Sequence, residues 1–174
     1  MSFKRKLFSF SDSPTGSEID LRAKFDELVY GGNGKIPHGQ HVVVRNIRRD
    51  SEDKKIKCTC FDEMTQESAV HCAYCDEVGF LWDEVWHEAY ATFSGSSSSS
   101  IKRSHKVFYF RYDTAIRYGD VIVEMKLDLE GKVIVPYSRV AIYTPETIQE
   151  CRSDRGRIEY IAVFCNEETV CRFD

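Results

Sequence analysis

The most regular alternation of apolar and polar positions in the chain lies between residues 121 and 129. Apolar side chains occupy every second position there: Val121, Val123, Met125, Leu127 and Leu129. A period of two is typical of a β-strand with one buried face, so we expect these five side chains to share one side and to be largely buried. Glu130-Gly131 then predicts a turn, after which residues 132–135 return.

Several further stretches predict short strands separated by regularly spaced turns, which favours a small β-barrel or sandwich. They are the valine-rich stretch 39–49, the chain from Val107 onward, residues 139–143, a hairpin of 147–152 with 157–165 around the turn 153–156, and residues 169–173. Residues 80–93 are rich in aromatic side chains at spacings that fit either a helix or a strand. We favour a strand there.

Residues 17–29 predict a short helix whose simplest role is to cover a sheet. Ser17 and Asp20 suit a capping box, and Gly31-Gly32 ends the segment. Apolar side chains fall on one helical face at Leu21, Phe25, Leu28 and Val29. We expect residues 1–16 to form a flexible arm and the serine-rich residues 94–100 to form a loop.

The composition indicates a globular chain: 174 residues, 42% of them apolar, with a formal net charge of -4. An acidic balance argues against a generic nucleic-acid coat, although it leaves local basic patches open. No apolar run is long enough to span a membrane, and no apolar segment of a secretory signal follows the basic residues 4–6. We therefore expect a reducing cytoplasm, where seven cysteines are thiols or metal ligands rather than disulfides.

Four of these cysteines have the spacing of a zinc ribbon: Cys58-x-Cys60 and, after eleven intervening residues, Cys72-x-x-Cys75. Zn²⁺ takes four ligands in a tetrahedron, and four thiolates leave no open position, so the predicted site is structural. Two alternatives stay open. His71 could replace a cysteine, with Cys58 the least secure ligand because the first pair is so tight, and an iron–sulfur cluster also uses four cysteines.

The remaining cysteines, Cys151, Cys165 and Cys171, fall in predicted strands, where we expect small buried apolar side chains.

Basic residues form two groups with more than one interpretation. Lys102, Arg103, His105 and Lys106 follow the serine-rich loop. They suit mobile contacts to DNA phosphates or, equally, a solvated basic turn. The arginines of the first predicted strand are Arg45, Arg48 and Arg49. They suit a phosphate-facing patch or an ordinary solvated edge, since acidic residues follow them directly.

The motifs of common enzymes fail in this chain, and we expect no catalytic activity. His87-Glu88 starts like a zinc protease, but Ala91 stands where the second histidine would be needed. A zinc deaminase would need proline before the cysteine pair, whereas His71 precedes Cys72. No GxSxG, P-loop or GxGxxG sequence occurs.

Several runs of residues resemble known virion proteins. Residues 44–50, 58–60, 65–67 and 72–84 resemble zinc-ribbon virion proteins of tailed bacteriophages. The runs Gly119-Asp120-Val121-Ile122 and 152–160 are similar to the β-barrel half of head-closure (neck or stopper) proteins. The resemblance covers most of residues 20–165. The chain departs from it at Glu77, where those ribbons commonly have glycine; this puts the shape of the turn in doubt but not the metal ligands.

The resemblance implies a virion protein, made in the host cytoplasm, that forms a homo-oligomeric ring between portal and tail. Its partners would be itself, portal or adaptor proteins, tail proteins and packaged double-stranded DNA, with Lys102, Arg103 and Lys106 as candidate DNA-channel contacts. No membrane partner is expected.

The expected fold is mainly β: a small β-barrel with a short N-terminal helix and a zinc-ribbon insertion. Its predicted parts are an arm (1–16), the helix and first strand (17–57), the zinc ribbon (58–80) and the barrel (81–174). A nucleic-acid-binding or regulatory zinc-ribbon protein is the second hypothesis. Asp62, Glu63 and Glu67 weigh against it, because acidic residues in the ribbon repel phosphate.

Overall fold

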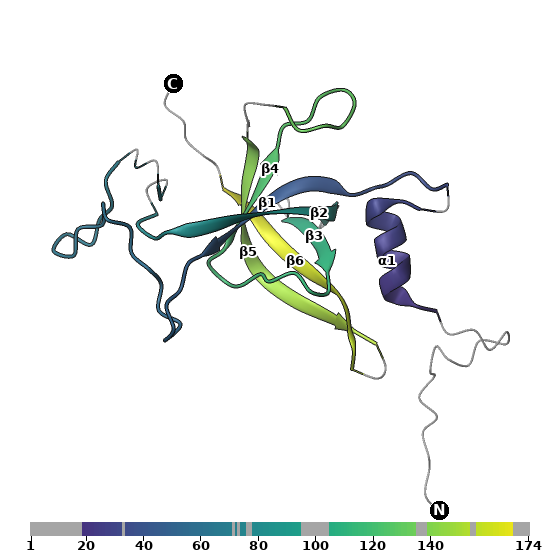
Figure 1. Ribbon diagram of the computed structural model, residues 1–174, viewed down its shortest axis with the longest axis horizontal. Helices are drawn as coiled ribbons and strands as arrows, with labels where there is room; N and C mark the ends of the chain where they lie inside the picture. Colours follow the sequence, from purple (N-terminus) through teal and green to yellow (C-terminus); the bar gives the residue numbers. More distant parts are fainter. Residues whose placement is uncertain are drawn as a thin grey trace, which may run out of the picture.

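The computed structural model describes residues 19–32, 34–70, 72, 74–75, 78–94, 105–134, 139–153 and 156–168. Its elements are α1 (Leu21–Tyr30), β1 (Gln40–Ile47), β2 (Trp82–Ser94), β3 (His105–Arg111), β4 (Val121–Met125), β5 (Arg139–Arg152) and β6 (Ile158–Glu168). The strands close into a barrel in the order β1-β2-β3-β6-β5-β4 (Figure 1). The prediction of a mainly β chain with a small barrel and a short N-terminal helix is confirmed.

Some sequence predictions fall outside the described residues: the arm 1–16, the Ser17 cap, the serine-rich loop after Ser94, and the strand 169–173.

The interior of the barrel has a large apolar cluster that receives side chains from every strand. It contains Val42 and Val44 of β1, Ala89 of β2, Phe108 and Phe110 of β3, Ile122 of β4, Tyr143 of β5, and Ile161, Val163 and Cys165 of β6. Strand β1 pairs with both β2 and β4, which closes the sheet and leaves no free edge. Strand β1 belongs to the barrel, so the barrel begins at Gln40 and extends beyond the predicted range 81–174.

The alternation predicted strand β4 correctly, and Val123 and Met125 are buried as expected, but the barrel interior lies on the other side of the strand. Ile122 faces the barrel interior, whereas Val123 and Met125 point outward and pack on Val43 in a second apolar cluster. Apolar groups cover both faces of β4, so alternation alone does not reveal the interior. The strand also ends at Met125, and Leu129 is fully exposed in the following hairpin, with a relative accessibility of 108%.

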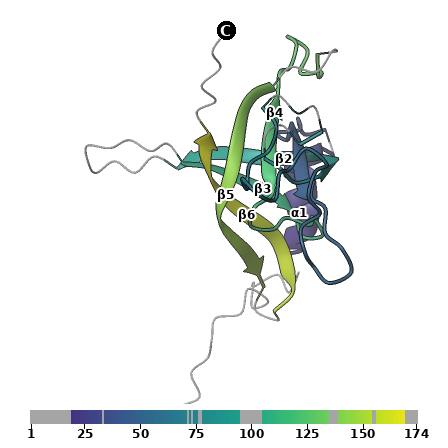
Figure 2. The same cartoon turned by 90° about the vertical axis from the view of Figure 1, so that its left-hand side faces the viewer.

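Strand β5 is continuous where the sequence predicted two separate pieces. Pro145 interrupts the pattern between 139–143 and 147–152, because proline has no N–H to donate to a sheet. The ladder between β5 and β6 accommodates it with a shift in register between Pro145 and Thr147. A bulge of this kind lets a central strand tolerate proline. The result is a long curved pair, β5 and β6 (Figure 2).

Helix α1 covers one side of the barrel and contacts β2, β3 and β6. The Asp20 side chain caps it by accepting a hydrogen bond from the Arg22 N–H at 3.2 Å. Phe25 and Val29 are buried, and the Phe25 ring stacks on Tyr160 at 5.7 Å between centroids. The other two predicted core residues of the helix, Leu21 and Leu28, are exposed. Of the helices in the described residues, none is long and apolar enough to cross a membrane.

The two sides of β4 and its hairpin give a direct test of this arrangement. Ile122→Ala should lower the free energy of unfolding by about 2–4 kcal/mol, because it opens a cavity in the barrel interior. Leu129→Ala should change it by less than about 0.5 kcal/mol, because the side chain is in solvent. Urea unfolding of the two variants measures both. Equal destabilisation would contradict the assignment of inside and outside.

Candidate metal centre

The segment between β1 and β2 carries the four clustered cysteines, and a short pairing of residues 56–58 with residues 79–81 holds its two ends together. Lys57 and Phe80 form a bridge beyond the barrel, and the Cys58 N–H donates to the Gly79 carbonyl at 2.8 Å. The first and last parts of the cysteine module, residues 58–80, are thereby held side by side. The module projects from the barrel on the side opposite α1 (Figure 1).

Two tight turns present the cysteines. The Phe61 N–H donates to the Cys58 carbonyl at 3.0 Å, and the Val78 N–H donates to the Cys75 carbonyl at 3.0 Å. Gly79 follows the second turn with a φ of 80°, a conformation that favours glycine. An added Cβ there would also lie 2.7 Å from the Phe61 ring. Glu77 lies outside the described residues, and Gly79 supplies the backbone freedom at the exit of this turn.

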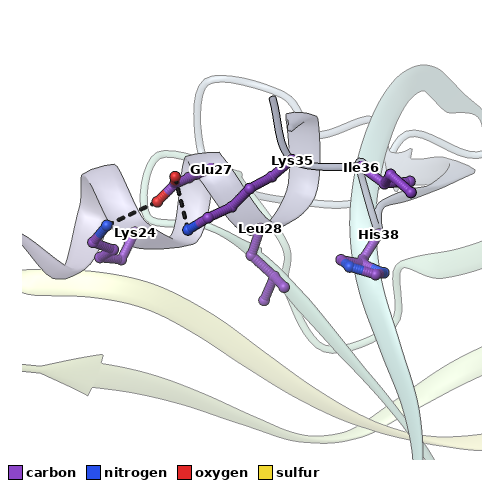
Figure 3. Close-up of a pocket in the computed structure, with 6 residues that line it drawn as sticks. All are labelled: Lys24, Glu27, Leu28, Lys35, Ile36 and His38. Carbon is purple, nitrogen blue, oxygen red and sulfur yellow. Dashed lines mark hydrogen bonds and ion pairs between the residues drawn. The ribbon is translucent and has the colours of Figure 1, made fainter. Parts of the chain in front are cut away.

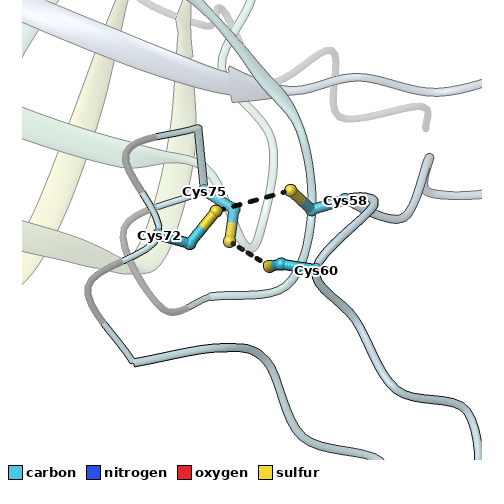
Figure 4. A group of neighbouring side chains, drawn as sticks. All are labelled: Cys58, Cys60, Cys72 and Cys75. Carbon is cyan, nitrogen blue, oxygen red and sulfur yellow. Dashed lines mark hydrogen bonds between the residues drawn. The ribbon is translucent and has the colours of Figure 1, made fainter.

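The four sulfur atoms converge on one point (Figure 4). The Sγ atoms of Cys58 and Cys72 are 3.8 Å apart, those of Cys60 and Cys75 are 3.3 Å apart, and all four lie within 4.8 Å of one another. All four cysteines are free thiols. A tetrahedral ion with metal–sulfur bonds of about 2.3 Å would separate its sulfur ligands by about 3.8 Å. The cluster is therefore compatible with one bound metal ion.

The surroundings of the thiols differ. Cys58 and Cys75 are buried, and Cys60 and Cys72 are half-buried. Backbone N–H groups of Tyr74 and Cys75 lower the pKa of Cys72 to about 6, whereas desolvation raises the pKa of Cys60 to about 12. Without a cation the cluster cannot hold four thiolates, because neighbouring negative charges repel one another in a partly dry site. A bound cation supplies the missing charge.

The predicted ligand set Cys58, Cys60, Cys72 and Cys75 is thus brought together, while His71 lies outside the described residues. Cys165 is buried in the barrel interior and burial raises its pKa to about 12, as expected for a small apolar side chain. Cys151 is half-buried on β5, and Cys171 lies outside the described residues.

The arginines of the first strand have carboxylate partners. Arg45 is buried, pairs with Glu84 at 2.9 Å and lies over the Trp82 ring. Arg48 pairs with Asp83 at 2.6 Å and Arg49 with Asp53 at 3.6 Å. These ion pairs argue against a phosphate-binding patch; the solvated-edge interpretation suits Arg48, which is exposed, but not the buried Arg45.

The basic group after the serine-rich loop is divided by the structure. Lys102 and Arg103 lie outside the described residues, and of His105 only the backbone, in β3, is described. The prediction that Lys106 lies on a mobile loop is wrong: its relative accessibility is 5%. Its ammonium is 2.6 Å from a Glu124 oxygen inside one end of the barrel, so it is not available to DNA phosphates.

Lys106 and Glu124 form the centre of an interior polar network. The Tyr143 hydroxyl donates to Glu124 at 3.1 Å, and the Gln40 amide donates to it at 3.3 Å. The rings of Phe108 and Tyr143 lie 5.2 and 5.1 Å from the Lys106 ammonium. Burial and the neighbouring Glu124 carboxylate raise the pKa of Tyr143, so its hydroxyl stays a donor. The sequence shows Glu124 only as a charged residue among the apolar residues of β4.

No protein-family model matches the sequence, and no curated protein is significantly similar to it.

The interior ion pair predicts an unequal response to removing its charges. Glu124→Gln leaves the Lys106 ammonium buried without a counter-charge and should lower the free energy of unfolding by about 3 kcal/mol. Adding Lys106→Met should recover part of that loss, because no charge then remains and the introduced amide can still accept from Tyr143. Guanidinium unfolding of the single and double variants measures this. A Glu124→Gln variant as stable as the wild type would contradict the buried pair.

Proposed function

We propose that the chain is a non-enzymatic structural protein of a tailed-bacteriophage virion that binds one structural zinc ion. Its proposed position in the virion is the neck or head-closure ring between portal and tail, around the DNA channel. The observation that carries the proposal is a four-cysteine cluster on two turns, inserted between β1 and β2 of a small closed barrel. That combination fits what the sequence resemblance implies.

Zinc suits this donor set better than the alternatives. A single tetrahedral ion needs the short separations found among the four sulfur atoms. A polynuclear iron–sulfur cluster places irons and sulfides between its cysteines, so its ligand sulfurs lie farther apart. Four protein ligands leave no position for a substrate or water, which favours a structural role. When bound, zinc would cross-link the two turns of the module.

The neck assignment rests on the residues that carry the resemblance. Two of those runs, residues 119–122 and 152–160, contain side chains whose contacts suit a rigid ring subunit. Gly119 adopts a φ of 92°, and the buried Asp120 carboxylate then accepts hydrogen bonds from the Ile47 and Arg117 N–H groups. Arg157 binds the buried Glu159 carboxylate at 2.9 Å beside α1. These contacts fix the loop before β4 and the β5–β6 hairpin.

Packaged DNA is the least specified of the proposed partners. Lys102 and Arg103 remain the candidate DNA contacts in the sequence. Lys106 is not a DNA contact, because it is buried in an ion pair with Glu124. The contact would be to phosphates without base readout, since lysine and arginine on a loop act as charges.

The second hypothesis, a nucleic-acid-binding zinc-ribbon protein, is disfavoured by the module itself. Residues 58–80 contain five acidic residues and no lysine or arginine. Lys57 pairs with Glu63 at 3.0 Å and offsets one of these charges, and the remaining excess of negative charge repels phosphate.

The metal prediction is about one zinc per purified chain, as a single four-thiolate site implies. Cys75→Ser removes a buried sulfur and should abolish zinc binding, while Cys151→Ser, outside the cluster, should retain it. The barrel should still unfold cooperatively in Cys75→Ser, because its apolar clusters contain no residue of the module. Elemental analysis and thermal unfolding measure these outcomes. Iron with visible absorbance, or zinc retained by Cys75→Ser, would contradict the site.

The location prediction is that purified virions of the phage that encodes this chain contain it in a fixed copy number at the head–tail junction. Antibody labelling in electron micrographs locates it, and a cryo-electron map counts its copies, with a tail-tube antibody as the control. Infected-cell lysates that contain the chain while virions lack it would contradict the neck assignment.

A further inference from the structure

The cysteine module exposes large apolar side chains that contribute nothing to a core. The exposed fractions are 93% for Met64, 73% for Val70 and 74% for Tyr74. Apolar side chains held in solvent on a small cross-linked module are a common feature of docking surfaces. The module also carries an excess of negative charge, since its sequence has five acidic residues and no lysine or arginine; Lys57, directly before it, pairs with Glu63 at 3.0 Å and offsets one of these charges. Its best partner is therefore apolar and positively charged.

A groove with those properties lies on the same chain, between α1 and residues 34–39. The helix ends at Gly31, and the chain then folds back, with the His38 and Gly39 N–H groups donating to the carbonyls of Leu28 and Val29. Between helix and returning chain is a depression of about 500 Å³. It is lined by Lys24, Glu27, Leu28, Lys35, Ile36 and His38 (Figure 3).

The groove offers apolar contact and a net positive charge. Leu28 and Ile36 are both exposed. The ammonium groups of Lys24 and Lys35 lie 2.9 and 2.8 Å from the two oxygens of Glu27. Hydrogen bonds from these lysines lower the pKa of Glu27 to about 2, so the carboxylate is charged near neutral pH. Two cations then share one anion, and one positive charge is left over beside the apolar side chains.

The two surfaces lie on opposite sides of the barrel, with the cysteine module on one side and α1 on the other (Figure 1). They cannot meet within one chain, but the module of one copy can meet the groove of another. We propose that the chain self-associates head to tail, with the acidic, apolar cysteine module of one copy seated in the groove between α1 and residues 34–39 of the next. A contact between two different surfaces generates a ring when its rotation closes.

This inference deepens the ring assembly of the proposed function by naming its two contact surfaces, and it is tested separately. Met64→Ser/Tyr74→Ser alters the module without touching a cysteine. Ile36→Ser/Lys35→Glu alters the groove without touching the helix core. Leu129→Ser is the matched control. It removes a fully exposed apolar side chain that belongs to neither the module nor the groove. Circular dichroism and zinc content establish that each variant is folded.

Sedimentation velocity of the full chain measures the association. Each two-residue variant should weaken self-association by about tenfold or more, and the control should not. A mixture of the two variants should form heterodimers and nothing larger, because each pair retains one intact module and one intact groove. A wild-type chain that stays monomeric at about 100 μM, a variant that assembles normally, or a mixture that stays monomeric would overturn the proposal.

The outcomes separate this contact from the neck assignment. A zinc-containing chain that is found in virions but fails the mixing experiment refutes the contact alone. A chain that passes the mixing experiment but is absent from virions refutes the neck assignment alone.

Discussion

The pairing of β1 with β2 holds together the two parts of this molecule. Within the barrel it aligns Gln40 with Ala89 and Ile47 with Trp82, and β1 closes the sheet by pairing with β4 on its other side. Beyond the barrel the Arg48 N–H donates to the Leu81 carbonyl, residues 49–55 fold into a small hairpin, and residues 56–58 then pair with residues 79–81. This second pairing, next to the end of the β1–β2 ladder, brings the two ends of the cysteine module together.

Local features of the sequence were sufficient to predict the cysteine site. Cys58 and Cys60 share one turn, Cys75 begins another, and Cys72 lies three residues before it, so spacing alone restricts how far apart four such sulfurs can lie. The strand content was predictable for the same reason, since alternation and turn residues act over a few positions.

Features that depend on distant pairing were not predictable. Alternation in β4 could not show that Ile122 faces the interior, because the other face is also covered by Val43 and its neighbours. The burial of Lys106 depends on Glu124, eighteen residues away on another strand. A lysine beside a serine-rich segment carries no local sign of such a partner. Pro145 interrupts the strand pattern in the sequence. The bulge that accommodates it arises only from the pairing of β5 with β6, which the local sequence does not show.

The charged residues of the described barrel and helix mostly act as structural contacts. Asp120 holds the end of β1, Glu159 receives Arg157, and Glu124 receives Lys106. Buried carboxylates with specific donors fix one arrangement of strands among many that an apolar core would allow. The proposed assembly would use two surfaces outside this frame, the cysteine module and the groove beside α1.

X-ray absorption at the zinc edge of the purified full-length chain tests the metal centre most directly. The structure predicts a first shell of four sulfur neighbours at about 2.3 Å and no lighter ligand. A shell containing nitrogen or oxygen would show that a residue such as His71, or water, completes the site in place of one cysteine. A chain with no zinc signal after purification without chelators would contradict a structural zinc centre altogether.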